Sequence, residues 1–123
     1  MKKIFNNNSS SNLLKVFLAY SNGYFPMGKS KNSNEIQWVK PNNRGIIPIG
    51  KLYCSKSLKK FIKKNEFDIS FNKNFKDVIF NCANRKTTWI NSTIYNLFLD
   101  LHKQGFAHSV EVKKQEILVG GLY

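Results

Sequence analysis

The stretch from Thr88 to Tyr123 constrains the fold most, because two different hydrophobic periods follow one another in it. In its first part, apolar residues recur every three or four positions, as on one face of an α-helix: Ile94, Leu97, Phe98 and Leu101. Asn91 or Ser92 is suited to cap the start of this helix, and Gly105 is suited to end it. The spacing therefore predicts an amphipathic helix between these two ends.

A β-hairpin is predicted to follow the helix. Val110 and Val112 alternate with polar neighbours, and residues 113–116 are polar enough to form the turn. The last segment is apolar nearly throughout and contains Gly120-Gly121, a pair that indicates a bulge or the close approach of another backbone. Glu111 lies between the two valines, so its side chain is expected on the opposite face of the strand, in a surface ion pair.

The preceding part of the chain alternates between helical and extended patterns. The elements expected there are a helix that Ser11 or Asn12 caps and that ends near Gly23, a polar loop over 28–34, strands over 36–39 and 45–49, a basic helix over 55–64, a strand over 68–71 and a helix over 72–83. Pro26 favours extended geometry in the residue before it, and Pro48 interrupts the second strand. Residues 1–11 are expected to form a polar, frayed lead-in. Together these elements predict an α+β or α/β fold.

The chain carries a large positive charge. It has 20 Lys and Arg residues against 7 Asp and Glu, which gives a formal net charge of +13. Such an excess is typical of proteins with a polyanionic partner, although a Lys- and Asn-rich composition also arises in AT-rich genomes. The basic helix carries lysines at helical spacing that are candidates for contacts with RNA phosphates, the alternative being an ordinary solvated face: Lys56, Lys59, Lys60, Lys63 and Lys64.

The cysteines and histidines indicate no metal site. Cys54 and Cys82 lack a metal-ligand spacing such as CxxC, and two reduced thiols in a cytoplasmic protein are expected. His102 and His108 lie on either side of a helix end, where structural hydrogen bonding is a simpler role than metal binding or general-base catalysis. The sequence contains neither the apolar run of a signal peptide nor the run of about 18 apolar residues that a membrane span needs.

Six short motifs follow one another along the chain in an order that identifies a family. They are Gly23-Tyr24-Phe25-Pro26-Met27, Trp38 with Pro41, Arg44-Gly45-Ile46-Ile47-Pro48, Thr88-Trp89-Ile90, Leu101-His102 with Gly105 and Ala107-His108-Ser109-Val110-Glu111, and Leu118-Val119-Gly120-Gly121-Leu122-Tyr123. The set resembles the bacterial leucyl/phenylalanyl-tRNA–protein transferases, which move an amino acid from aminoacyl-tRNA to the N-terminus of a protein. Their order, and no single motif, carries the resemblance.

The resemblance implies a fold in two parts. A small N-terminal module over 1–65, which includes the basic helix, would precede the first half of an acetyltransferase-like (GNAT-type) domain over 66–123. Members of the family are longer, so the chain is expected to stop inside the acyltransferase fold. The carboxylate and amide groups assigned to catalysis, and most of the pocket for the transferred side chain, would then lie beyond Tyr123, and no catalytic residue is expected within the chain.

The resemblance also assigns candidate binding residues. Trp89, Met27 and Trp38 are expected around the aminoacyl-adenosine end of the tRNA, where an aromatic face can stack on the base. Packing in the core is the competing role of Trp38. The basic helix is linked by the resemblance to the acceptor arm of the tRNA. Phe98 stands where a tyrosine is expected, so the hydrogen bond of that hydroxyl is lost.

The reaction that the resemblance implies joins Leu or Phe, carried as an ester on tRNA, to the α-amine of a protein that begins with Arg or Lys and so tags it for degradation. The ester is already activated, so no metal or other cofactor is expected, and positioning would supply much of the rate. A cytoplasmic monomer without membrane contact is expected. Two alternatives remain open: a basic fragment that binds RNA without catalysis, and a chain that does not fold stably because its last strand leaves an apolar edge unpaired.

Overall fold

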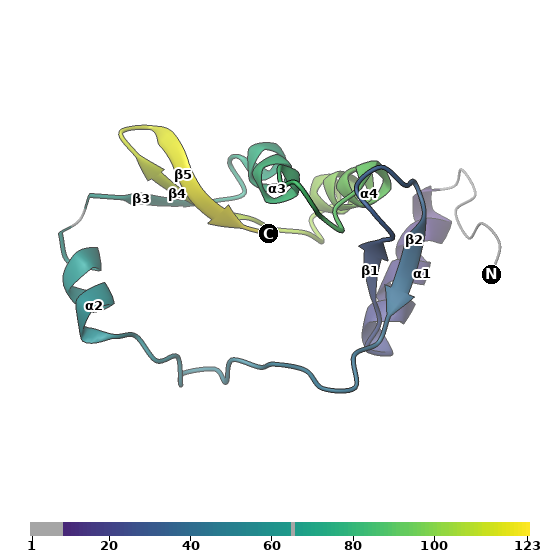
Figure 1. The fold of residues 1–123 in the computed structure, drawn as a ribbon, viewed down its shortest axis with the longest axis horizontal. Coiled ribbons are helices and arrows are strands. Elements are labelled where there is room, and N and C mark those ends of the chain that lie inside the picture. Colours follow the sequence, from purple (N-terminus) through teal and green to yellow (C-terminus); the bar gives the residue numbers. More distant parts are fainter. Residues whose placement is uncertain (1–8, 65) are drawn as a thin grey trace.

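The computed structural model describes residues 9–64 and 66–123 (Figure 1). Its helices and strands are, in chain order, α1 (Ser9–Ser21), β1 (Phe25–Gly28), β2 (Ile36–Val39), α2 (Lys56–Ile62), β3 (Asp68–Phe71), α3 (Phe75–Ala83), α4 (Ser92–Lys103), β4 (Val110–Lys114) and β5 (Ile117–Leu122). The fold is a mixed arrangement of helices with small antiparallel sheets, which agrees with the predicted α+β class. Most of the predicted lead-in lies outside the described residues.

The first elements are a helix and a two-stranded ribbon. β1 and β2 pair antiparallel with Pro26 opposite Trp38, and α1 packs beside β1. The sequence did not predict β1, because Pro26 lacks the N–H that a central strand needs. A strand of a two-stranded ribbon has a partner on one side alone, so the proline nitrogen can face away from it without the loss of a hydrogen bond. The Pro26 side chain is fully buried. α1 begins at Ser9, before the predicted caps Ser11 and Asn12.

The C-terminal elements form a three-stranded sheet, in the order β3-β4-β5, that packs against α3. Ser70, Glu111 and Gly121 are aligned across the three strands and share the face toward α3. A Cβ at Gly121 would lie 2.9 Å from a Val78 methyl group and 2.9 Å from the carbonyl oxygen of Val110, so glycine permits this close approach. The register between β4 and β5 also shifts at Val112, which confirms the bulge predicted from the glycine pair.

The predicted ends of α4 are confirmed. The Asn91 side-chain oxygen accepts a hydrogen bond from the Ile94 amide at 2.9 Å and caps the first turn. Gly105, with φ of 81°, follows the last turn in the left-handed region that glycine favours. The helix of the sequence prediction therefore has the start and the end that its capping residues indicate.

One core joins the N-terminal helix to the C-terminal elements. Its buried residues come from α1, α3, α4 and the segments beside them: Val16, Phe75, Ile79, Ile90, Ile94, Leu101 and Ala107. Trp38 and Ile36 of β2 pack against this core as partly buried residues. The division into modules at residues 65 and 66 stays a prediction.

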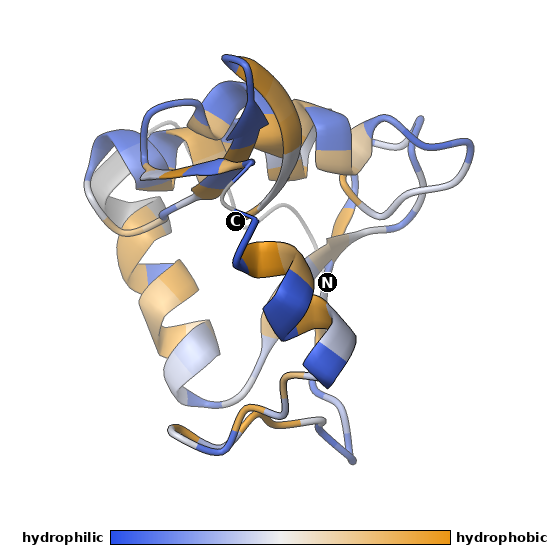
Figure 2. Ribbon diagram, turned by 90° about the vertical axis from the view of Figure 1, so that its left-hand side faces the viewer, coloured by the Kyte–Doolittle hydropathy of each residue, from blue (hydrophilic) through white to orange (hydrophobic). Residues whose placement is uncertain are grey.

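Residues 40–55, here called the strap, connect β2 to α2 without regular structure, so the strand predicted over 45–49 is wrong. Pro48 lacks an amide hydrogen, and neither sheet offers these residues a partner strand. The strap and α2 run apart from the three-stranded sheet (Figure 1). Hydrophobic residues alternate with polar ones along the strap (Figure 2). No residue of α2 is buried. The ring of Phe61 in α2 packs against the ring of Phe67, with centroids 5.3 Å apart.

Candidate functional site

Trp89 lies in the loop between α3 and α4 and lines a pocket of about 210 Å³. The end of α3, the loop and the end of β5 form its walls: Cys82, Arg85, Thr87, Thr88, Trp89, Ile90, Leu122 and Tyr123. The Trp89 side chain is 40% exposed, so its ring offers surface to a ligand. An exposed indole can stack on a nucleobase, and a nearby guanidinium can pair with a phosphate. Sequence reasoning missed Arg85, because nothing in its spacing separates it from the other cations.

Hydrogen bonds fix the Trp89 loop against the β1–β2 ribbon. The Gly28 amide donates to the Trp89 carbonyl at 2.8 Å. Asn91, which is 2% exposed, donates from its side-chain amide to the carbonyls of Ser33 and Glu35 at 2.6 and 3.0 Å. The predicted polar loop over 28–34 is thereby held against the start of α4. The loop that carries the tryptophan is positioned by the ribbon as well as by its own helices.

The two other residues expected at the aminoacyl-adenosine lie on opposite faces of the ribbon. Trp38 is opposite Pro26 and packs against the core, whereas Met27 is opposite Gln37 and faces the other way. Met27 adjoins Gly28, whose amide holds the Trp89 carbonyl. The structure therefore places the residue after Met27 in contact with the backbone of Trp89. The Trp38 side chain lies on the other face of the ribbon and packs against the core.

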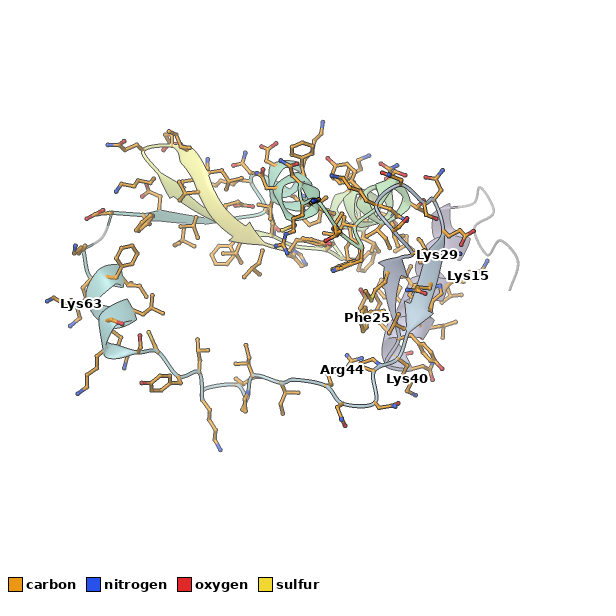
Figure 3. All side chains as sticks on the ribbon, in the orientation of Figure 1. Lys15, Phe25, Lys29, Lys40, Arg44 and Lys63 are labelled. Atoms are coloured by element: carbon orange, nitrogen blue, oxygen red, sulfur yellow. The ribbon has the colours of Figure 1, made fainter. Side chains whose placement is uncertain are left out.

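The basic helix is present and solvated. The Ser55 hydroxyl oxygen caps α2 by accepting from the Leu58 amide at 3.2 Å. The five candidate lysines are all exposed: Lys56, Lys59, Lys60, Lys63 and Lys64. Lys63 points away from the remainder of the chain (Figure 3). This geometry leaves the ammonium groups accessible to phosphates, and their role in tRNA binding stays a prediction.

A second group of cations lies around the β1–β2 ribbon (Figure 3). The Arg44 guanidinium donates to the Gly23 carbonyl at 2.8 Å and lies 6.0 Å from the centre of the Phe25 ring. The Lys40 ammonium lies 5.4 Å from the Tyr24 ring. These contacts hold the start of the strap against the residues where β1 begins, and they place two positive charges there.

Glu111 is not in a surface ion pair, and that prediction is wrong. Its side chain has no exposed surface, and the carboxylate accepts hydrogen bonds from the hydroxyls of Ser109 and Ser70, at 2.5 and 2.6 Å. The amides of Lys73 and Asn74, at the start of α3, donate to it at 3.4 and 3.3 Å. Burial alone would raise the pKa of Glu111, but these four hydrogen bonds outweigh it and hold the pKa below its ordinary value. Alternation placed this residue on the correct face, but that face is covered by α3.

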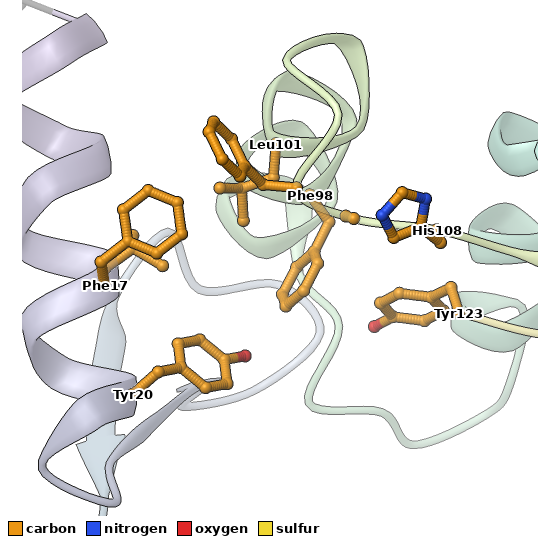
Figure 4. Close-up of a pocket in the computed structure, with 9 residues that line it drawn as sticks. Phe17, Tyr20, Phe98, Leu101, His108 and Tyr123 are labelled. Carbon is orange, nitrogen blue, oxygen red and sulfur yellow. The ribbon is translucent and has the colours of Figure 1, made fainter.

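Tyr123 lines a second, larger and more apolar pocket between α1 and α4 (Figure 4). The pocket has a volume of about 390 Å³, and the Phe98 ring meets the Tyr123 ring edge to face, with centroids 5.2 Å apart. Burial raises the pKa of Tyr123 and of Tyr20, whose hydroxyl also lies at this pocket (Figure 4). The Tyr123 hydroxyl is buried and has no hydrogen-bond partner among the described residues. Phe98, at the place of the expected tyrosine, cannot supply one.

The histidines have the structural roles that the sequence favours. Nδ1 of His102 lies 2.8 Å from the Ala107 carbonyl, and its ring stacks on Phe75 with centroids 4.1 Å apart. Nδ1 of His108 lies 3.1 Å from the Asn72 side-chain amide. Over residues 9–64 and 66–123, no cluster of three or more His, Cys, Asp or Glu side chains could hold a metal ion. Within the same ranges, no helix is both long and apolar enough to cross a bilayer.

Comparison with known proteins points to one class of protein, the tRNA-dependent transferases. The model of the family described as leucyl/phenylalanyl-tRNA protein transferase matches residues 46–123. The leucyl/phenylalanyl-tRNA–protein transferase of Ruegeria sp. (strain TM1040) is 45% identical over 105 residues, which are 85% of this chain and 50% of the relative. The proteins of the same name from Cereibacter sphaeroides (strain KD131) and Dinoroseobacter shibae are 43% and 38% identical, over 85% and 90% of this chain.

The chain therefore belongs to the leucyl/phenylalanyl-tRNA–protein transferase family, as its motifs indicate. It spans about half the length of the curated relatives it matches, since the matched segments cover 50%, 49% and 48% of them. The pocket that contains Trp89 and the last strand both lie inside the segment that the family model matches.

Proposed function

We propose that the chain carries the tRNA-facing part of an enzyme that transfers Leu or Phe from aminoacyl-tRNA to the α-amine of a protein beginning with Arg or Lys. One observation carries the proposal: Trp89, in the Thr-Trp-Ile motif, is 40% exposed and lines a pocket together with Arg85. The names of the relatives supply the reaction type. The order of β3, α3, α4, β4 and β5 supports an acetyltransferase-like fold for this region.

In the proposed reaction, the α-amine nitrogen of the acceptor attacks the ester carbonyl carbon of the aminoacyl-tRNA. A carbon–nitrogen bond forms, the bond from that carbon to the ribose oxygen breaks, and an amine proton ends on the ribose oxygen. The ester is activated before it binds, so holding both substrates in contact supplies much of the rate. The acid–base groups of the reaction belong, in this proposal, to the half of the relatives that the chain does not match.

Residues of this chain would hold the charged end of the tRNA. Trp89 would stack on the terminal base, Arg85 would contact a nearby phosphate, and Met27 would extend the contact from β1. Trp38 would act by keeping the ribbon in place from the core side. The lysines of α2 would neutralise phosphates farther along the acceptor arm, because they are exposed and carried on an element that projects from the body.

A transfer assay tests the proposal. Labelled Phe-tRNA is mixed with a peptide that begins with Arg, first with the chain alone and then with the chain co-expressed with the unmatched half of the Ruegeria relative. We expect transfer with both halves and none with the chain alone, and a peptide that begins with Asp is the matched control. Transfer by the chain alone would contradict the assignment of the acid–base groups. Binding of tRNA by both halves without any transfer would favour an RNA-binding protein.

A further inference from the structure

The loop between β1 and β2 reaches the segment that follows α3. The ammonium of Lys31 donates a hydrogen bond to the carbonyl oxygen of Arg85 at 2.8 Å, although the two residues are 54 positions apart in the sequence. The amide of Ser33 donates to the carbonyl of Ser30 at 3.3 Å, which closes a turn with Lys31 inside it. The fold thus places one basic side chain against the backbone of a second basic residue.

Hydrogen bonds from the start of α4 hold this loop in place. The Ser92 hydroxyl donates to the Asn34 side-chain oxygen at 2.8 Å. The Thr93 hydroxyl donates to the Asn34 carbonyl at 2.9 Å. Together with the bonds from Asn91, they fix the loop to the first turn of the helix that follows Trp89. The loop and the tryptophan are therefore anchored to the same segment.

The charges of Lys31 and Arg85 are not neutralised by a carboxylate. The described residues include all seven Asp and Glu residues of the chain, and neither cation is in an ion pair with any of them. The ion pairs present join other lysines to four of these carboxylates: Glu35, Glu66, Asp100 and Glu116. Both cationic side chains are exposed. A cation held against the backbone of another, with no carboxylate to compensate either charge, favours binding of an anion there.

We propose that Lys31 and Arg85, here called the cation pair, bind one phosphate group of the RNA strand whose terminal base stacks on Trp89. The inference rests on the proposed function and adds to it a residue of the loop between β1 and β2. Arg85 lines the Trp89 pocket, so the base and the phosphate are held by neighbouring groups. A guanidinium can bind a phosphate through two parallel hydrogen bonds, and an ammonium adds a point charge. Lys31 is in this reaction a positioning residue, which fixes the RNA strand and takes no part in proton transfer.

A purely structural role of Lys31 is the alternative, because a cation near the C-terminal end of a helix interacts favourably with the carbonyl groups there. That role predicts a loss of stability when the charge of Lys31 is removed, but no change in the preference of the chain for a phosphate. The two roles therefore differ in a ratio of two affinities, one for a ligand with a phosphate and one for the same ligand without it.

Three small ligands test the cation pair: adenosine, adenosine 5′-monophosphate and the dinucleotide cytidylyl-(3′→5′)-adenosine. Their dissociation constants are measured by NMR titration, followed at the indole N–H of Trp89. Adenosine offers the base without a phosphate, so the ratio of its dissociation constant to that of the monophosphate isolates the phosphate contact. We expect the native chain to bind both phosphate-containing ligands about tenfold more tightly than adenosine, because a hydrogen bond to a charged group contributes at least that factor.

Variants of the pair should change this ratio. Lys31→Gln and Arg85→Gln should each lower it to about threefold or less, whereas Lys31→Arg should keep it because the charge and the donor remain. Lys76→Gln is the matched control for total charge, since Lys76 is exposed at the opposite end of α3 from Arg85. Urea unfolding shows whether each variant folds. If Lys31→Gln does not, Arg85→Gln decides the question, because the bond from Lys31 ends on the backbone of Arg85 and survives the change.

The proposal is overturned if no ligand shifts the Trp89 signal, if adenosine and its monophosphate bind equally, or if folded Lys31→Gln keeps the native ratio. It is also overturned if Lys76→Gln lowers the ratio as much as Lys31→Gln, because total charge would then explain the effect. Binding of the monophosphate without the dinucleotide would show a site for a free nucleotide and would overturn it as well. The transfer assay judges the proposed function separately: transfer by both halves, with equal binding of adenosine and its monophosphate, would remove the cation pair and leave the reaction.

Discussion

The amide of Gly28 donates a hydrogen bond to the carbonyl oxygen of Trp89 across 2.8 Å, and this bond couples the β1–β2 ribbon to the loop of the candidate pocket. A Cβ at position 28 would lie 2.5 Å from that oxygen and 2.6 Å from Nδ2 of Asn91. These distances are shorter than any ordinary contact of a carbon atom. Glycine is therefore required at this position for the two segments to meet as they do.

Gly28→Ala should consequently destabilise the chain by about 1–3 kcal/mol, because the ribbon or the Trp89 loop must shift to make room for the methyl group. The change is measured as the midpoint of urea unfolding. Gly45→Ala is the control, since a Cβ at Gly45 meets nothing within 4 Å and its free energy of unfolding should change by no more than about 0.5 kcal/mol. Equal midpoints for the two variants would show that the close approach is not maintained in solution.

Glu111→Gln should also destabilise the chain. The amide group would place an N–H where the carboxylate now accepts from Ser109, Ser70 and the amides at the start of α3. Loss of a buried acceptor costs about 1–3 kcal/mol. The free energy of unfolding at neutral pH measures the effect, and Glu116→Gln, in the exposed turn between β4 and β5, is the matched control.

The same carboxylate predicts a pH dependence. Its pKa is lower in the folded chain than in the unfolded chain, so its contribution to stability is complete above the ordinary Glu pKa of about 4.3 and is lost as the pH falls through the lower, folded value. The difference in stability between the native chain and Glu111→Gln should be constant above about pH 5 and should shrink below about pH 4. A difference that grows toward low pH would mean that the carboxylate is not held by these donors.

Tyr123→Phe should leave stability unchanged or raise it by up to about 1 kcal/mol. The Tyr123 hydroxyl is buried without a partner among the described residues, so its removal loses no hydrogen bond and relieves a desolvated polar group. Thermal unfolding measures the change, and Tyr53→Phe serves as the control because the Tyr53 side chain is 86% exposed. A clear loss of stability in Tyr123→Phe alone would reveal a partner for the hydroxyl.

Local patterns predicted the elements whose ends carry their own signals. The helix over 92–103 has Asn91 and Gly105 at its ends, and the strands over 36–39 and 68–71 are confirmed with the same bounds. The strand over 45–49 failed because strand formation needs a partner strand, which local sequence does not reveal. β1 was missed because Pro26 argues against a strand locally, whereas the fold supplies a partner strand, β2, that pairs with it.

The candidate site was less predictable, because it depends on which residues the fold brings together. The motif Thr88-Trp89-Ile90 singled out the tryptophan, but that Arg85 lines the same pocket follows from where α3 ends in the fold. Alternation placed Glu111 on a definite face, yet only the packing of α3 decides that this face is buried. Periodicity gives the direction of a side chain within its own element, and tertiary packing gives its environment.

The lysines of α2 should contribute electrostatic affinity for tRNA. Lys59→Gln together with Lys63→Gln removes two exposed charges, and the slope of log affinity against log salt concentration should fall by about 1–2. Filter binding of Phe-tRNA at several salt concentrations measures this slope. Lys76→Gln with Lys73→Gln, at the start of α3, is the matched control for total charge. An unchanged slope in the α2 variant would place the phosphate contacts elsewhere.

Trp89→Ala should weaken binding at the end of the tRNA and leave the salt dependence unchanged, because an indole carries no charge. Loss of one stacked base costs about 1–3 kcal/mol, or about 5- to 150-fold in affinity. Two ligands separate this effect from a general loss of binding: Phe-tRNA, and the same tRNA without its terminal adenosine. The native chain should prefer the first ligand, and Trp89→Ala should bind both equally. Phe80→Ala, another exposed aromatic residue, should keep the preference. If Trp89→Ala keeps it as well, the terminal base does not stack on Trp89.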